Sequence, residues 1–217
     1  MKSAVIFDMD GVLVDNRDIH IEAFQILFEK LGLHATYEQI LMTFGMVNTQ
    51  IFATLFGEGT FTPEEIEKMG IEKEIIYRDI FSKKIEPAPG LIPFLAELRA
   101  KGVKMAVGSS GPRVNVEFVL DKCHIADYFD AIADGNMISR GKPDPEVFLL
   151  AAQLLEKKPE ECIVFEDALV GIEAGKKAGM TVIAMETTFP AARLEGSGYD
   201  RLIRSFHDVD ASILEQF

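Results

Sequence analysis

The sequence predicts an α/β protein, with a Rossmann-like parallel sheet covered by helices on both faces and an inserted all-helical cap domain. Short apolar runs alternate with helical patterns along most of the chain, which is typical of parallel strands buried on both faces. One interval, residues 15–81, breaks this alternation and shows helical patterns only. The composition, 48% hydrophobic and 26% charged, is that of an ordinary globular protein with enough chain to bury a core.

The core of this fold is expected from five strands and the helices between them. The strands are short apolar segments at residues 4–7, 104–107, 131–133, 163–165 and 182–185. The helices carry apolar residues at helical spacing and lie at residues 91–101, 114–123, 145–155 and 170–178. Repetition of strand and helix in this order predicts a parallel sheet.

The cap is expected from amphipathic helices between the first strand and the rest of the sheet. Residues 19–31 form one such helix. Residues 62–65 (TPEE) combine a capping box with proline at the first helical position and open a long helix toward Phe81. We therefore expect residues 1–14 and 82–217 to form the α/β core and residues 15–81 to form the cap domain.

Charge and cysteine content narrow the class of protein. With 22 Lys and Arg against 35 Asp and Glu, the formal charge is −13, which disfavours nucleic acid or an anionic membrane surface as a partner. Cys123 and Cys162 are too few for a disulfide framework. No segment resembles a signal peptide or approaches the roughly 18 apolar residues of a membrane span. We expect a cytoplasmic protein, monomeric by default for a capped fold of this size.

Polar residues follow four of the expected strands. They are Asp8 and Asp10 after the first strand, Ser109 after the second, Lys142 after the third, and Glu166 and Asp167 after the fourth. Ligands of open parallel sheets bind beyond the carboxyl ends of the strands, so these side chains should share one rim.

The chemistry that suits this set is phosphoryl transfer through an aspartyl-phosphate. A carboxylate such as Asp8 is a competent nucleophile toward phosphorus once a divalent cation offsets the repulsion between two anions. Asp8 and Asp167, assisted by Glu166, offer the hard oxygen ligands that hold Mg²⁺ beside a phosphate. Lys142 adds a positive charge, and the Ser109 hydroxyl with neighbouring N–H groups can donate to phosphate oxygens.

Asp10 is the expected general acid and base. It lies two residues after Asp8, so both side chains would point to the same side if strand geometry persisted. Gly11 permits an abrupt turn at that point. We expect Asp10 to protonate the leaving oxygen and then to deprotonate the attacking water, a role worth about 10² to 10⁴ in rate.

These motifs resemble those of the haloacid dehalogenase superfamily, in its capped phosphatase branch with beta-phosphoglucomutase and sugar-phosphate phosphatases. Residues 8–13 (DMDGVL) resemble the first family motif, Ser109 the second, Lys142 within GKPDP the third, and Glu166 with Asp167 the fourth. The resemblance covers essentially the whole chain. It implies that Asp8 is the nucleophile, that Asp10 is the acid/base, and that Mg²⁺ is held by Asp8, the Asp10 backbone carbonyl and Asp167, with Glu166 nearby.

The same resemblance predicts roles for three residues of the cap. His20 and Lys73 match a His and a Lys that couple cap closure to the position of Asp10, although His20 also lies on an apolar helical face that suits the edge of a core. Asn48 stands where the mutases carry an Arg that grips the distal phosphate of a bisphosphate. A neutral amide cannot replace that charged bidentate contact, so the mutase interpretation is weakened.

The expected function is therefore Mg²⁺-dependent hydrolysis of a small phosphorylated metabolite, a sugar or polyol phosphate. A phosphomutase, in which a sugar hydroxyl replaces water as the acceptor, is the nearest alternative. A regulatory receiver-like module lacks both the acid/base at the position of Asp10 and a large cap. A non-catalytic regulator that binds a phosphometabolite stays open, as does the identity of the substrate.

Overall fold

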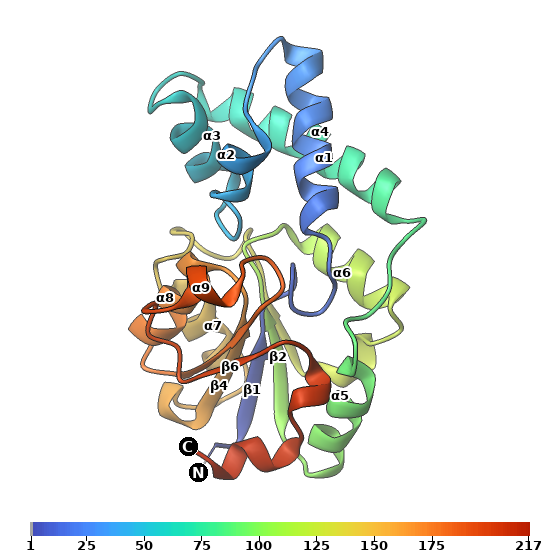
Figure 1. The fold of residues 1–217 in the computed structure, drawn as a ribbon, viewed down its shortest axis with the longest axis vertical. Coiled ribbons are helices and arrows are strands. Elements are labelled where there is room, and N and C mark those ends of the chain that lie inside the picture. The colour runs from blue at the N-terminus through green and yellow to red at the C-terminus, as the bar shows by residue number, and fades with distance from the viewer. Residues whose placement is uncertain (1) are drawn as a thin grey trace.

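A six-stranded parallel sheet forms the centre of the computed structural model, which describes residues 2–217, in the order β3-β2-β1-β4-β5-β6 (Figure 1). The strands are β1 Ala4–Phe7, β2 Lys104–Gly108, β3 Ala131–Ala133, β4 Cys162–Glu166, β5 Thr181–Met185 and β6 Arg201–Ile203. The predicted α/β class is confirmed, and the five predicted strands are correct to within one residue at each end. The sixth strand was not predicted, because it is a three-residue edge strand without an apolar run.

Helices cover both faces of the sheet. They are α5 Leu91–Ala100 and α6 Arg113–Lys122 on one face, and α7 Glu146–Leu154 and α8 Leu169–Lys177 on the other. Side chains of β1 alternate between the two layers: Val5 and Phe7 pack with α5 and α6, whereas Ala4 and Ile6 pack with α7 and α8. All four are fully buried, so β1 lies in the middle of the hydrophobic core.

Four helices lie over the carboxyl end of the sheet (Figure 1). They are α1 Arg17–Leu31, α2 Tyr37–Leu41, α3 Asn48–Phe56 and α4 Pro63–Phe81, and we call them the cap. The predicted capping box is present at the start of α4, where the Thr62 hydroxyl accepts from the Glu65 N–H at 3.2 Å and the Glu65 carboxylate accepts from the Thr62 N–H at 2.8 Å. The division into a core of 1–14 and 82–217 and a cap domain of 15–81 stays a prediction.

The remaining elements are short. They are helix α9 Ala191–Leu194 and the 3₁₀ turns Ala126–Tyr128, Pro159–Glu161, Phe206–Asp208 and Ala211–Glu215. No helix within residues 2–217 combines the length and apolar character needed to cross a membrane.

Strand order and register place the candidate site. The order of the strands reverses beside β1, so its carboxyl end lies between β2 and β4. Phe7 is in register with Val107 on one side and Phe165 on the other. The residues that follow these strands therefore emerge at the same level, under the cap.

The packing of α4 turns two charged residues inward. Its buried positions include Met69, Lys73, Tyr77 and Phe81, which are spaced four residues apart, and Glu74 beside Lys73. This stripe faces α1, with which α4 is in contact. A helix with nine charged residues among its 19 thus brings an ammonium and a carboxylate to the interface between cap and core.

Candidate active site

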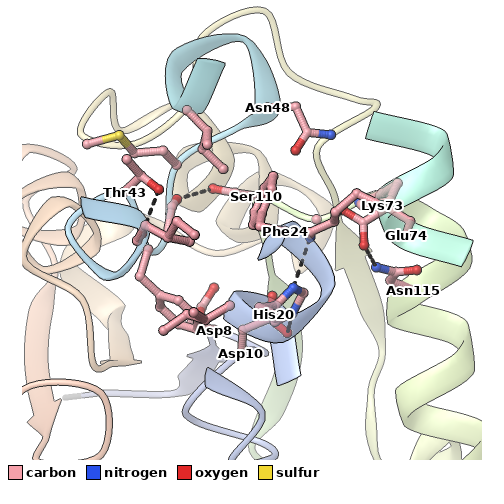
Figure 2. Close-up of a pocket in the computed structure, with 18 residues that line it drawn as sticks. Asp8, Asp10, His20, Phe24, Thr43, Asn48, Lys73, Glu74, Ser110 and Asn115 are labelled. Atoms are coloured by element: carbon pink, nitrogen blue, oxygen red, sulfur yellow. Dashed lines mark hydrogen bonds and ion pairs between the residues drawn. The ribbon is translucent and has the colours of Figure 1, made fainter. Parts of the chain in front are cut away.

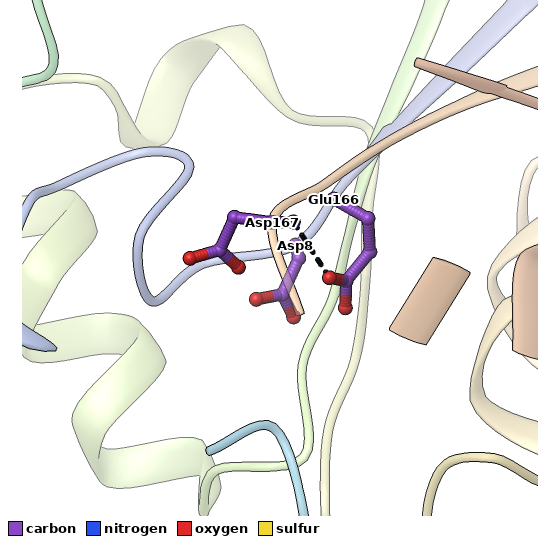
Figure 3. Close-up of side chains that lie close together, drawn as sticks. All are labelled: Asp8, Glu166 and Asp167. Atoms are coloured by element: carbon purple, nitrogen blue, oxygen red, sulfur yellow. Dashed lines mark hydrogen bonds between the residues drawn. The ribbon is translucent and has the colours of Figure 1, made fainter. Parts of the chain in front are cut away.

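Three carboxylates converge at the carboxyl end of β1 and β4 (Figure 3). One ligand atom each of Asp8, Glu166 and Asp167 lies within 4.8 Å of the other two. The Lys142 ammonium donates to Asp8 Oδ1 at 2.6 Å and to Glu166 Oε1 at 2.7 Å. All four residues are at most 5% exposed, so one ammonium lies among three carboxylates with little contact with solvent. The cluster carries an excess of negative charge.

The pKa values in this cluster reflect that excess. Burial raises the pKa of Asp8 to about 7, because Lys142 offsets only part of the burial effect while Glu166 and Asp10 add repulsion. Burial, together with the charges of Glu166 and Asp8, raises the pKa of Asp167 well above its ordinary value. Burial alone would lower the pKa of Lys142, but Asp8 and Glu166 outweigh it and raise that pKa. A further cation beside the cluster would therefore favour the ionised forms of Asp8 and Asp167.

The residues fit a magnesium ion. Asp167 Oδ1 is buried and has no hydrogen-bond partner among the described residues, which is costly for a carboxylate oxygen. A divalent cation held by Asp8, Glu166 and Asp167 would pair this oxygen and balance the cluster. Oxygen ligands with few protein charges are the set that Mg²⁺ takes beside a phosphate. The participation of the Asp10 backbone carbonyl stays a prediction.

Two glycines give these carboxylates the space they occupy. Gly11 has a φ of +78°, and a Cβ there would lie 1.8 Å from Asp167 Oδ2. A Cβ on Gly171 of α8 would lie 1.6 Å from Glu166 Oε1. The other Glu166 oxygen accepts the backbone N–H groups of Asp167 at 2.7 Å and Ala168 at 2.6 Å. Close approach of the β1 turn and of α8 therefore shapes the cluster.

Asp10 occupies a different environment from Asp8, although both line one pocket between cap and core (Figure 2). Strand β1 ends at Phe7, so this common orientation comes from the turn that follows and not from strand pleating. Asp10 Oδ1 accepts from Asn16 Nδ2 at 2.6 Å and from His20 Nε2 at 3.1 Å. Burial would raise the pKa of Asp10, but His20 and the Asn16 amide outweigh it and lower that pKa. Asp10 is thus held as a carboxylate.

His20 connects Asp10 to Lys73. The Lys73 ammonium lies 2.9 Å from His20 Nδ1 and donates to Glu74 Oε1 at 2.8 Å. Because an ammonium has donors only, His20 Nδ1 must accept, and the ring hydrogen is on Nε2, where it is donated to Asp10. The imidazole stacks on Tyr77 with ring centroids 4.0 Å apart. The structure brings together the three residues that the sequence grouped, and His20 lies between Asp10 and Lys73.

The rest of the pocket is formed largely by the cap. Its apolar lining comes from Ile21, Phe24, Ile40, Phe44, Met46 and Ile51. Its ionisable lining consists of the carboxyl groups of Asp8, Asp10 and Glu74 and the nitrogenous side chains of His20 and Lys73. Both nitrogenous side chains already have partners within the protein. Among the described lining residues, no cation is free to bind a second anionic group.

Ser109 does not line this pocket. It is buried, and its Oγ accepts from the Gly111 N–H at 3.0 Å. Its neighbour Ser110 does line the pocket, and the Ser110 hydroxyl donates to the Gly45 carbonyl of the cap at 2.7 Å. The role of Ser109 in holding a phosphate therefore stays a prediction, and the adjacent residues form the surface of the pocket.

Asn48 does line the pocket, from the first residue of α3 (Figure 2). Its side chain lies against α4 at Gly70, where a Cβ would be 2.5 Å from Asn48 Nδ2. The absence of a side chain at Gly70 leaves room for an amide that offers one donor group and one acceptor.

Comparison with known proteins establishes the family. The model of the haloacid dehalogenase-like hydrolases matches residues 5–185. This chain belongs to the haloacid dehalogenase-like hydrolase family. It is 32% identical to the phosphorylated carbohydrates phosphatase of Thermotoga maritima over 177 residues, 82% of each chain. It is 30% identical to the beta-phosphoglucomutase of Bacillus subtilis over 219 residues, which cover 98% of this chain and 94% of that protein.

A solved structure agrees with this result. The beta-phosphoglucomutase of Clostridium difficile superimposes with a TM-score of 0.89 at 26% identity, covering 100% of this chain and 96% of the other. The predicted resemblance, fold class and type of enzyme are confirmed for this haloacid dehalogenase-like hydrolase. Its relatives include both phosphatases and phosphomutases, so the comparisons support either activity.

Three buried polar residues of this haloacid dehalogenase-like hydrolase were missed at the sequence level. Asn16 occupies the N-cap position of α1, but it makes no capping bond, and its amide instead donates to Asp10 and to the Tyr77 hydroxyl. Glu74 lies in a helix with many charges and has the sequence signature of a solvated residue. Asn115 gives no signal at all. The four-residue spacing of buried positions in α4 passes through Lys73 and not through Glu74, so it would not have pointed to Glu74 either.

Proposed function

We propose that this protein is a Mg²⁺-dependent phosphohydrolase that acts on a small phosphorylated metabolite, a sugar or polyol phosphate, through an aspartyl-phosphate. One observation carries the proposal: the buried cluster of three carboxylates and one lysine reaches the pocket at Asp8, and Asp10 lines the same pocket. The printed activities of the relatives, a phosphorylated carbohydrates phosphatase and a beta-phosphoglucomutase, support this class of substrate.

Asp8 is the nucleophile in this proposal. Of the three clustered carboxylates, only Asp8 lines the pocket within the described part of the chain. Lys142 holds its Oδ1, which leaves Oδ2 to attack phosphorus. A bond forms between this oxygen and phosphorus while the bond from phosphorus to the ester oxygen breaks. When bound by Asp8, Glu166 and Asp167, Mg²⁺ would neutralise the cluster and reduce the repulsion between carboxylate and phosphate.

Asp10 is the general acid and the general base in this proposal. His20 and Asn16 hold its Oδ1, and its Oδ2 is directed toward Gly111 in the pocket wall, where a Cβ would lie 3.9 Å away. A phosphate dianion beside Asp10 raises the pKa of its carboxyl by charge repulsion, which provides the protonated form. Asp10 then gives its proton to the leaving oxygen. As a carboxylate again, it takes a proton from the water that hydrolyses the aspartyl-phosphate.

The pocket favours an ester with one phosphate. A bisphosphate would need a second cationic group, and the described lining offers His20 and Lys73 only, both already paired. The apolar lining and the Asn48 amide suit a neutral leaving group with hydroxyls. This charge balance favours hydrolysis over mutase chemistry, which proceeds through a bisphosphate.

A ³¹P NMR time course tests the proposal. The purified protein would be incubated with Mg²⁺ and a panel of hexose, pentose and polyol phosphates, including beta-glucose 1-phosphate with a trace of the 1,6-bisphosphate. We expect the signal of inorganic phosphate to increase with at least one substrate of the panel. Adding EDTA, or using the Asp8→Asn variant, should abolish that increase. Migration of the signal from the 1- to the 6-position without free phosphate would show a mutase instead. An acyl-phosphate that persists for hours without turnover would indicate a non-catalytic regulator.

A further inference from the structure

We propose that Asn115 is a positioning residue that makes the orientation of Asp10 depend on contact between cap and core. The proposal rests on the proposed function, because it takes Asp10 as the general acid. Asn115 belongs to α6 of the core and is 1% exposed. It lines the pocket but lies at the far end of a series of polar side chains that leads to Asp10 (Figure 2).

Both ends of the Asn115 amide bind the cap helix α4. Arg78 Nη1 donates to Asn115 Oδ1 at 2.5 Å, and Asn115 Nδ2 donates to Glu74 Oε2 at 2.6 Å. A guanidinium can only donate and a carboxylate can only accept, so the orientation of the amide is fixed by its partners. Residues 74 and 78 are one helical turn apart on α4. One buried amide of the core therefore contacts two successive turns of the cap helix.

From Glu74 the hydrogen bonds continue without a break to Asp10. Lys73 Nζ donates to Glu74 Oε1 at 2.8 Å and to His20 Nδ1 at 2.9 Å. His20 Nε2 then donates to Asp10 Oδ1 at 3.1 Å. We call the series Asn115, Glu74, Lys73, His20 and Asp10 the hydrogen-bond relay. It begins on the core, passes through two cap helices and returns to the core.

The relay depends on Asn115 because Glu74 is buried. Burial would raise the pKa of Glu74, but the charge of Lys73 and hydrogen bonds from Lys73 and Asn115 lower that pKa. Without Asn115, Glu74 Oε2 becomes a buried carboxylate oxygen without a donor, which is costly. Lys73 is the donor at hand, and a shift of its ammonium toward Oε2 weakens its hydrogen bond to His20.

Contact between α4 and α6 is a contact between cap and core (Figure 1). Hydrogen bonds of 2.5 and 2.6 Å break when the helices that carry them separate. The relay is therefore complete only while the cap lies on the core. Asp10 is then oriented for proton transfer when the pocket is closed to water and loses that orientation when it opens.

The test compares two leaving groups in Asn115→Ala. One substrate is an alkyl phosphate that the wild type hydrolyses, whose leaving oxygen must be protonated as the P–O bond breaks. The other is 4-nitrophenyl phosphate, whose leaving group departs as a stable anion. The ratio kcat/KM reports on the steps up to the aspartyl-phosphate. We expect a fall of about 10- to 100-fold with the alkyl phosphate, and of less than about 3-fold with 4-nitrophenyl phosphate. Equal losses, or none, would overturn the proposal.

Two further variants separate the relay from general packing. Asn115→Asp keeps the size of the side chain and still accepts from Arg78, but it has no donor for Glu74, so it should behave like Asn115→Ala. If Asn115→Ala fails to fold, Asn115→Asp still tests whether the relay needs a donor at this position. Wild-type behaviour of Asn115→Asp would contradict the relay. Arg193→Ala is the matched control, since Arg193 Nη2 joins Glu38 Oε1 across cap and core at 2.6 Å on the exposed surface. Arg193→Ala should change kcat/KM equally for both substrates, and by less than about 2-fold.

A double mutant shows whether Asn115 acts through Glu74. Glu74→Gln keeps a single acceptor oxygen for two donors, so it cannot accept from both Lys73 and Asn115 as the carboxylate does. Combining it with Asn115→Ala should therefore lower kcat/KM no further than the more harmful single variant does. Additive losses would contradict the relay. A wild-type protein that hydrolyses neither ester would instead refute the proposed function. Hydrolysis of both esters with a uniform loss in Asn115→Ala would refute only the role of Asn115.

Discussion

Asp8 and Asp10 are two residues apart and have opposite electrostatic environments. The pKa of Asp8 is raised to about 7, mainly by burial, whereas the pKa of Asp10 is lowered because His20 and Asn16 outweigh its burial. A further cation thus favours the ionised form of Asp8, whereas Asp10 is already stabilised as an anion by its hydrogen-bond donors. Two carboxyls with such different surroundings suit the roles of nucleophile and acid/base.

Lys142 should be essential for stability when no metal is bound. In Lys142→Met, three carboxylates would remain buried without a cation, so we expect the free energy of unfolding in EDTA at pH 8 to fall by about 3–5 kcal/mol. Urea denaturation measures this change. Lys176→Met provides the control, because its exposed pair with Asp200, at 2.7 Å, should be worth less than about 1 kcal/mol. Similar losses in both variants would show that the buried cluster is not held together by Lys142.

At the scale of elements, the site depends on how closely α8 approaches the end of β4. Gly171 and Gly175 both lie on α8, one turn apart, yet they face different neighbours. A Cβ on Gly171 would meet Glu166 Oε1 at 1.6 Å, whereas a Cβ on Gly175 would meet Val182 Cγ2 at 2.7 Å. The first position therefore concerns the carboxylate cluster, where we propose that Mg²⁺ binds, and the second concerns packing alone.

Alanine at Gly171 and at Gly175 should distinguish an effect on Mg²⁺ binding from an effect on packing. We expect both variants to lose about 1–3 kcal/mol of stability through overpacking. Only Gly171→Ala should also weaken Mg²⁺ binding, by about 10-fold or more, because it displaces Glu166. Isothermal titration with Mg²⁺ measures the affinity, and thermal unfolding measures the stability. Equal Mg²⁺ affinities in the two variants would contradict the assignment of Glu166 to the metal site.

The elements also show what the sequence can and cannot predict. Five strands were predictable because each is a short apolar run, and the clustering of Asp8, Lys142 and Asp167 was predictable because residues that follow parallel strands meet at one edge of the sheet. Strand β6 was missed, since it lies at the edge and begins with Arg201. Glu74 and Asn115 were missed for a different reason: their importance comes from the contact of α4 with α6, which no local pattern encodes.

At the scale of the whole molecule, magnesium, pH and stability should be linked. The folded-state pKa values of Asp8 and Asp167 are raised, so between about pH 4 and 7 the folded state binds more protons than the unfolded state. In EDTA these two groups therefore make stability fall as pH rises, by up to about 1.4 kcal/mol per pH unit for each group that keeps its proton. Mg²⁺ bound by these carboxylates, as we propose, would replace those protons.

The gain in Tm on adding Mg²⁺ should consequently grow from pH 5.5 to pH 8. Each kcal/mol corresponds to about 2–4 °C for a chain of this size. Differential scanning calorimetry with and without EDTA at each pH measures the gain. In Asp8→Asn, which cannot titrate at this position, the dependence on pH should be shallower. A gain that is constant or shrinks with rising pH would show that Mg²⁺ does not displace protons from these carboxylates.

Trapping the phosphoryl group on Asp8 is the most direct test of the proposed mechanism. Asp10→Asn would be incubated with Mg²⁺ and 4-nitrophenyl phosphate, quenched in acid, and analysed by intact and peptide mass spectrometry. The first half-reaction needs no acid with this substrate, whereas hydrolysis needs the missing base, so one phosphoryl group should accumulate on the peptide that contains Asp8. The double variant with Asp8→Asn should carry none. A phosphoryl group on another peptide, or phosphate release by Asp8→Asn at the wild-type rate, would contradict the mechanism.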